Sequence, residues 1–121
     1  MKIFSALLFA IASLLVIPEA RAADTLEKSG NAYLEKCGPT APEVGKLVCW
    51  VYVLGFVNGL AADAAASEHK NICVPLEAQS GQLSDVIISY LQSHPDRRHW
   101  PTYVLAYIAF RESYACPVAQ K

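Results

Sequence analysis

The first 22 residues carry the three parts of a secretory signal peptide, and this leader constrains how the rest of the chain can fold. Met1-Lys2 is a short basic start, Ile3–Ile17 is almost wholly apolar and uncharged, and Ala20-Arg21-Ala22 is a small-x-small cleavage site. We therefore expect cleavage after Ala22 and a mature periplasmic chain, residues 23–121. A chain of that length has room for one domain with one core.

The composition favours a folded, soluble domain. Hydrophobic residues make up 54% of the chain and the formal net charge is −1, which excludes the disordered class and the basic surfaces that bind nucleic acid. A second uncharged run, Leu47–Ala62, falls short of the roughly 20 residues that a transmembrane helix needs. We therefore expect this run to be a buried core helix, with no membrane contact after the signal peptide is removed.

The mature chain keeps four cysteines, Cys37, Cys49, Cys73 and Cys116. An even number in an exported protein predicts two disulfides, and three pairings are possible. We favour Cys37–Cys49 across a short turn and Cys73–Cys116 between the middle and the end of the chain. A metal site is the alternative, with His69 and Cys73 four residues apart and Cys49 as a third ligand. No Cys-x-x-Cys pair accompanies them, so we expect neither a metal nor a cofactor.

Helix signals divide the mature chain into four segments, of which two lie in the first half. The first predicted helix covers Thr25–Cys37, with Asp24 as its cap and Glu27 completing a capping box. The second begins at Thr40-Ala41-Pro42-Glu43, where Thr40 is the predicted cap and the proline occupies the first turn. It is predicted to extend to about Ala66.

The apolar centre of the second helix, Leu47–Leu60, predicts that it is the central helix of a bundle. Gly55 and Gly59, four residues apart, predict a close crossing by a neighbouring helix. A homodimer is also possible, because an exposed apolar patch could form from the two glycines together with Trp50, Phe56 and Trp100. The sequence leaves open whether these residues are core or interface.

The last two helices have clearer apolar stripes. The third is predicted to start at Ser80 and to end before Pro95, and its buried stripe consists of Leu83, Val86, Ile87, Tyr90 and Leu91. The fourth is predicted from Trp100-Pro101 to Cys116-Pro117, and its inward-facing residues are Val104, Leu105, Tyr107 and Ile108. The predicted fold is therefore all-α, a small disulfide-stapled bundle of about four helices.

The titratable segment His94-x-Asp96-Arg97-Arg98-His99 is the only cluster that looks like a chemical site. Its arginines could hold an anion, but a solvated turn is the alternative interpretation. Ser93 and His94 are expected to be a poor nucleophile–base pair, because sequence neighbours lie about 100° apart on a helix. The chain also lacks GxSxG, HExxH and phosphate-loop motifs, so we expect no enzyme activity.

The irregular segment 67–80 is the first candidate for a surface that contacts a partner, since contact residues concentrate on loops held by rigid scaffolds. The polar residues at its start are Glu68, His69, Lys70 and Asn71. A plain connector between two helices is the alternative interpretation.

Five short elements occur in a fixed order: CWVYVLGFVNG at 49–59, CVP at 73–75, GQL at 81–83, YLQSHPDRR at 90–98 and YAC at 114–116. In this order they resemble the Rap/Tai-type immunity proteins of type VI secretion, from about Leu34 to Cys116. The resemblance implies a non-catalytic periplasmic protein that binds and occludes a toxin, which is a peptidoglycan amidase in the best-known members. It also implies a disulfide between Cys73 and Cys116, and it carries over no contact residue. A general periplasmic binding or stress module, such as an acid-responsive helical chaperone, is the alternative hypothesis.

Overall fold

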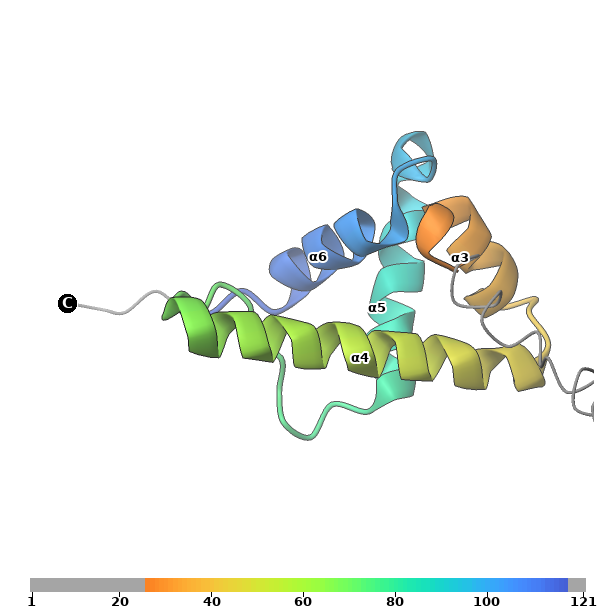
Figure 1. Cartoon of the computed structure of the whole chain (residues 1–121). Helices are drawn as coiled ribbons and strands as arrows, with labels where there is room; N and C mark the ends of the chain where they lie inside the picture. The colour runs from red at the N-terminus through yellow and green to blue at the C-terminus, as the bar shows by residue number, and fades with distance from the viewer. Residues whose placement is uncertain (1–25, 118–121) are drawn as a thin grey trace, which may run out of the picture.

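The computed structural model describes residues 26–117, so the predicted signal peptide and the predicted cap Asp24 lie outside it. The elements, in chain order, are α3 (Gly30–Cys37), α4 (Glu43–Ser67), α5 (Ser80–Ser93), the short 3-10 helix η1 (Pro95–Arg97) and α6 (Thr102–Ser113) (Figure 1). Residues 26–117 contain no strand, and an isolated bridge pairs Ile72 with Ala115. The predicted all-α bundle is confirmed.

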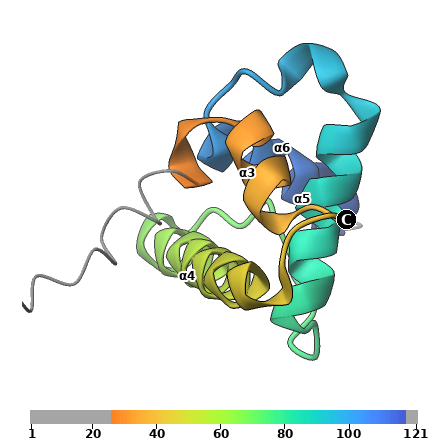
Figure 2. The same ribbon diagram turned by 90° about the vertical axis from the view of Figure 1, so that its right-hand side faces the viewer.

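The helix at the centre of the bundle is α5, not α4 as the sequence predicted. α5 packs against α3, α4 and α6, while α4 runs along one side of the domain (Figures 1 and 2). The predicted stripe of α5 is confirmed, because Leu83, Ile87 and Leu91 are buried in the core. Gln79 rather than Ser80 is the N-cap of this helix, and it forms a capping box with Gln82.

The predicted first helix is interrupted at Ser29. Residues 26–28 are helical, but α3 starts afresh at Gly30, and the Ser29 hydroxyl accepts a hydrogen bond from the Ala32 amide at 3.3 Å. The Gly30 amide donates to the Trp100 carbonyl oxygen at 3.1 Å. A side chain at Gly30 would lie 2.5 Å from Leu91 Cδ2, so only glycine allows α3 to approach the core this closely.

Both expected disulfides are present. Cys37 and Cys49 join the end of α3 to α4 with their Cα atoms 5.9 Å apart, and Cys73 and Cys116 join the loop after α4 to the chain after α6 at 4.9 Å. The second cystine is supported by backbone pairing, since the Cys73 amide donates to the Tyr114 carbonyl oxygen at 2.7 Å. Because Cys49 and Cys73 are both in cystines, they are not available to the metal set considered above.

α4 contradicts the sequence expectation most clearly. It begins after Pro42, without a side-chain cap from Thr40, and its large apolar residues are mostly exposed rather than buried. Nothing lies within 4 Å of a Cβ built at Gly55 or Gly59, so no described helix crosses there. α4 is long and apolar enough to cross a bilayer, and only 11% of its most apolar stretch is buried in the structure.

Candidate interaction surface

The predicted contact loop, residues 68–71, is exposed at the end of α4. Glu68 ends the helix in the left-handed conformation, with a φ of 58°, and His69 Nδ1 bonds to the Ser67 carbonyl oxygen at 2.7 Å. At the other end of the loop, the Asn71 carbonyl oxygen accepts from the Cys116 amide at 3.2 Å. The loop is therefore held at both ends while the side chains of Glu68, His69, Lys70 and Asn71 face solvent.

A shallow hollow links this loop to α6. Its volume is about 40 Å³, and it lies between His69 and Asn71 of the loop, Asp63 of α4 and Tyr107 of α6. The sequence predicted that Tyr107 faces inward, but its side chain is exposed. The loop and the outer side of α6 therefore form a continuous surface.

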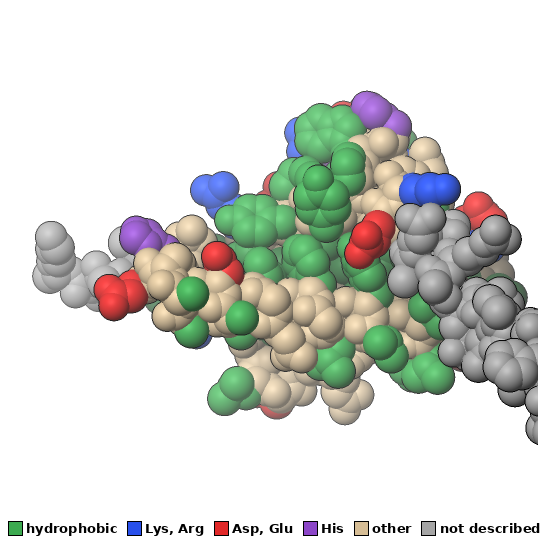
Figure 3. All heavy atoms as spheres, in the orientation of Figure 1, with side chains coloured by type: hydrophobic (Ala, Val, Ile, Leu, Met, Phe, Trp, Pro, Cys, Tyr) green, Lys and Arg blue, Asp and Glu red, His purple; other side chains and the backbone are tan. Residues whose placement is uncertain are grey.

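A larger groove runs between α4 and α6, with a volume of about 500 Å³ (Figure 3). Tyr52, Phe56 and Tyr103 line it, and Gly55 and Gly59 leave its α4 side open because they carry no side chain. The ring centroids of Tyr52 and Phe56 lie 6.5 Å apart, and those of Phe56 and Phe110 lie 5.9 Å apart. The groove is thus a rigid aromatic surface that continues into the core.

Three exposed aromatic residues, Trp100, Tyr103 and Tyr107, follow one another at steps of three and four along and just before α6. We call them the aromatic ridge. Large aromatic side chains on a rigid element are typical of the residues that dominate protein–protein binding. Sequence reasoning missed Tyr103, although its helical spacing from Trp100 and Tyr107 was a signal that could have found it.

The charges around the groove are acidic. Glu27 lines the groove, Asp63 lines the neighbouring hollow, and neither cavity is lined by a described lysine or arginine. Burial raises the pKa of Tyr52 to about 12, with a smaller contribution from Glu27. The Tyr52 hydroxyl is buried and has no hydrogen-bond partner among the described residues. The groove is therefore mainly apolar with one acidic side chain, while the loop and the ridge also have cations, Lys70 and Arg97.

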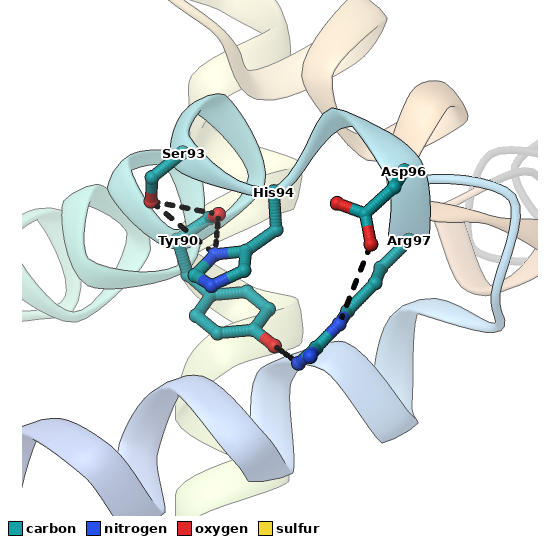
Figure 4. Close-up of polar contacts among 5 residues, drawn as sticks. All are labelled: Tyr90, Ser93, His94, Asp96 and Arg97. Atoms are coloured by element: carbon teal, nitrogen blue, oxygen red, sulfur yellow. Dashed lines mark hydrogen bonds and ion pairs between the residues drawn. The ribbon is translucent and has the colours of Figure 1, made fainter.

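The anion pocket that the paired arginines could have formed is not built. Arg97 donates through Nη1 to the Tyr90 hydroxyl at 2.8 Å, and this hydrogen bond raises the pKa of Arg97 (Figure 4). Arg98 donates in another direction, to the Leu91 carbonyl oxygen at 2.6 Å and the Gln92 carbonyl oxygen at 3.1 Å. Arg98 therefore satisfies carbonyl groups at the end of α5, Arg97 holds the Tyr90 hydroxyl, and the two arginines do not converge on a shared ligand.

Ser93 and His94 come closer than the sequence predicted. Ser93 Oγ lies 3.3 Å from His94 Nδ1 (Figure 4), which corrects the expectation that the two side chains point apart. The contact is not a nucleophile–base pair, because His94 Nδ1 is 2.9 Å from the Tyr90 carbonyl oxygen and must carry its proton to donate there. Ser93 Oγ itself donates to the Ser89 carbonyl oxygen at 2.8 Å.

The fold and this surface define a small, cystine-bonded helical domain whose exposed features are suited to contact with another macromolecule. The chain belongs to the Rap1a immunity proteins, because the model of that family matches residues 29–116. This match agrees with the resemblance found in the sequence. No match was found among the curated proteins or among the solved structures.

Proposed function

We propose that this protein is a non-catalytic immunity protein that binds and occludes a toxin delivered by type VI secretion, specifically a peptidoglycan amidase. Membership of the Rap1a immunity proteins across residues 29–116 is the observation that carries the proposal. The absence of a nucleophile–base pair at Ser93 and His94 agrees with inhibition by contact. Steric cover of the toxin's active site requires no chemistry from the inhibitor.

The proposed place of action is the periplasm. The predicted leader, residues 1–22, supports export, and the two cystines suit an oxidising compartment. A peptidoglycan amidase acts in that compartment, so inhibitor and toxin would meet there. We propose that the mature chain, residues 23–121, acts as a soluble single domain without a membrane anchor.

The proposed toxin-binding surface combines the contact loop, residues 68–71, with the aromatic ridge. The loop is exposed on a backbone that is fixed at both ends, so ordering it on binding would lose little conformational entropy. The ridge supplies large aromatic anchors beside it.

Co-production with the toxin tests the proposal. A cell that exports a candidate peptidoglycan amidase toxin to its periplasm should lyse, and co-production of the full chain should prevent lysis. A version without residues 1–22 should accumulate in the cytoplasm and give no protection. Continued lysis in cells that hold the mature protein in the periplasm would refute the proposed function.

Paired variants locate the surface. Tyr103→Ala and the double change His69→Ala with Lys70→Ala should each weaken toxin binding at least about tenfold in a calorimetric titration, since each removes an exposed anchor. Glu35→Ala, an exposed change on α3, is the matched control and should bind normally. Unchanged binding by both test variants would place the toxin elsewhere on the domain without refuting inhibition itself.

A further inference from the structure

Aromatic rings form much of the lining of the groove between α4 and α6. Figure 3 shows hydrophobic side chains gathered in this hollow. The Tyr52 hydroxyl is buried, so the part of Tyr52 that borders the groove is its ring. The rings of Tyr52 and Phe56 are nearly parallel, with an interplanar angle of 18°, and Phe56 packs against the core ring of Phe110. These ring surfaces are therefore fixed in place before any ligand enters.

Two glycines keep the α4 side of the groove open. Gly55 and Gly59 are about one helical turn apart, and a Cβ built at either has nothing within 4 Å. Each glycine lowers helix stability relative to alanine, yet the packing of the domain does not require either one. The groove volume of about 500 Å³ is within the range of sites that take a small ligand or a partner's side chain. The glycines thus preserve space that the fold itself leaves unused.

A single carboxylate, that of Glu27, is the charged group on the described lining of this groove. Lys70 and Arg97 belong to the loop and to the segment before the ridge, and neither lines the groove. Glu27 is exposed, and it lies close enough to Tyr52 to contribute to the raised pKa of that tyrosine. A carboxylate beside aromatic rings attracts an organic cation, because the ion pair and the ring quadrupoles act on the same charge.

An arginine side chain matches this lining better than other side chains do. Its planar guanidinium stacks on aromatic rings and donates two N–H groups to one carboxylate, while its apolar stem packs on apolar surface. The domain already contains one such pairing, since Arg97 Cζ lies 5.7 Å from the centroid of the Trp100 ring. An acidic side chain would be repelled by Glu27, and a neutral apolar one would give that carboxylate no partner.

We propose that the groove binds one arginine side chain of a partner protein, with the guanidinium between Glu27 and the aromatic rings and the stem over Gly55 and Gly59. This ligand chemistry stands on the groove alone. Naming the toxin as the partner rests on the proposed function. The groove would then extend the proposed toxin-binding surface, because Tyr103 borders both.

Nuclear magnetic resonance titrations of the mature, oxidised protein with two matched peptides test the ligand chemistry. Acetyl-glycyl-arginyl-glycine amide should shift the backbone signals of Gly55 and Gly59 and the ring signals of Tyr103. The same peptide with citrulline has a side chain of the same shape without the charge. It should bind at least about fivefold more weakly, because it loses the attraction to the rings and to the carboxylate.

Variants separate the charge of the groove from its space. Glu27→Gln should weaken binding of the arginine peptide about threefold and leave the citrulline peptide unchanged, whereas Glu35→Gln removes an exposed carboxylate from α3 and should have no effect. Gly55→Leu should abolish binding of both peptides by filling the groove. Ala65→Leu is its matched control, because it adds the same side chain at an exposed position of α4 outside the groove.

Three results would overturn the proposed ligand chemistry. The first is equal affinity for the two peptides, or no binding of either at tens of millimolar. The second is binding that Gly55→Leu leaves unchanged. The third is a set of groove signals that shift with protein concentration alone, because a second copy of the chain would then fill the groove.

Binding of a candidate peptidoglycan amidase to Gly55→Leu and Ala65→Leu distinguishes this proposal from the proposed function. Gly55→Leu should bind the amidase at least about tenfold more weakly than Ala65→Leu. A wild type that protects cells while both variants bind equally well overturns the toxin as the partner and leaves the proposed function standing. A wild type that selects the arginine peptide but gives no protection refutes the proposed function and supports the ligand chemistry of the groove.

Discussion

α5 and α4 are both rich in apolar residues, yet they use them in opposite ways. The apolar side chains of α5 lie along one stripe, and Leu83, Ile87 and Leu91 are buried in the core. Those of α4 surround the helix, so that Cys49 and Val53 face inward while Val51 remains exposed. The apolar content of a helix therefore predicts how much apolar surface it has. The periodicity of its apolar residues predicts which side of the helix is buried in the core.

The largest expected difference in stability is between truncating a side chain in the core and truncating one on the exposed side of α4. Phe110→Ala should lower the free energy of unfolding by about 3–5 kcal/mol, because Phe110 is fully buried in the core. Leu54→Ala should change it by less than about 0.5 kcal/mol in dilute protein, because Leu54 is exposed. Urea unfolding followed by circular dichroism measures both. A similar loss for both variants would mean that the outer side of α4 belongs to the core.

Removing each cystine separately compares how much each disulfide contributes to the stability of the domain. Cys73→Ala with Cys116→Ala opens a ring with a sequence separation of 43, and the chain-entropy relation gives a loss of about 4 kcal/mol. Cys37→Ala with Cys49→Ala opens a ring with a separation of 12, for a loss of about 3 kcal/mol. Thermal unfolding of the two double variants measures the ranking. The reverse ranking would show that packing around Cys49 outweighs ring size.

Alanine substitutions at two glycines, Gly30 beside the core and Gly55 on the exposed side of α4, extend the comparison. Gly30→Ala should destabilise the protein by about 1–3 kcal/mol, because the new Cβ would lie 2.5 Å from Leu91 Cδ2 and 2.7 Å from Leu105 Cδ1. Gly55→Ala should stabilise dilute protein by about 0.5–1 kcal/mol, because alanine favours the helix and meets nothing within 4 Å. Chemical denaturation of both variants gives the signs, and a loss of stability from Gly55→Ala would point to a close neighbour of α4.

The pH dependence of the free energy of unfolding should distinguish the fully buried Tyr33 from the half-buried Tyr52. Burial raises the pKa of Tyr33 far above its usual value of 10, despite its 2.8 Å hydrogen bond to Ser84. The unfolded chain therefore loses this proton first, and stability present below pH 10 should fall by roughly 1.4 kcal/mol per pH unit above it. The fall continues toward the pKa of the folded state.

Tyr52 should add a smaller loss, which ends near its folded pKa of about 12. Tyr33→Phe is the control, since it should be less stable near neutral pH yet show a flatter decline between pH 10 and 12. Urea midpoints at several alkaline pH values measure both slopes. Equal slopes for the wild type and Tyr33→Phe would contradict the assignment of the decline to this buried hydroxyl.

The sequence predicts the fold well where a pattern is local and unambiguous. The stripe of α5 follows from the spacing of its apolar residues, and the favoured pairing of the four cysteines, one of three that the sequence allows, is confirmed. The sequence predicts helix starts less precisely. Thr40 and Ser80 are good caps by residue type, but the N-cap of α4 is Pro42 and that of α5 is Gln79. The first lies two residues after the predicted cap and the second lies one residue before it. Only tertiary contacts decide between neighbouring caps.

The candidate surface could be predicted only in part. The exposure of residues 68–71 follows from their polarity, but the aromatic ridge depends on which side of α6 faces solvent, and Tyr107 was expected inside. The arginines after α5 look like an anion site in sequence, yet Arg98 bonds to carbonyl groups at the end of α5. A helix that is apolar on every side, like α4, carries no periodic signal that separates its inner face from its outer face.

The two cystines also decide what a protease could do to this molecule. The ring closed by Cys73 and Cys116 contains α5, η1 and α6, so a nick anywhere within it leaves the fragments tethered. The exposed segment 68–71 lies outside both rings, and one cut there would detach α3 and α4 covalently from the rest. A toxin seated on that segment would shield the scissile bonds, so resistance to digestion should report occupancy of the loop.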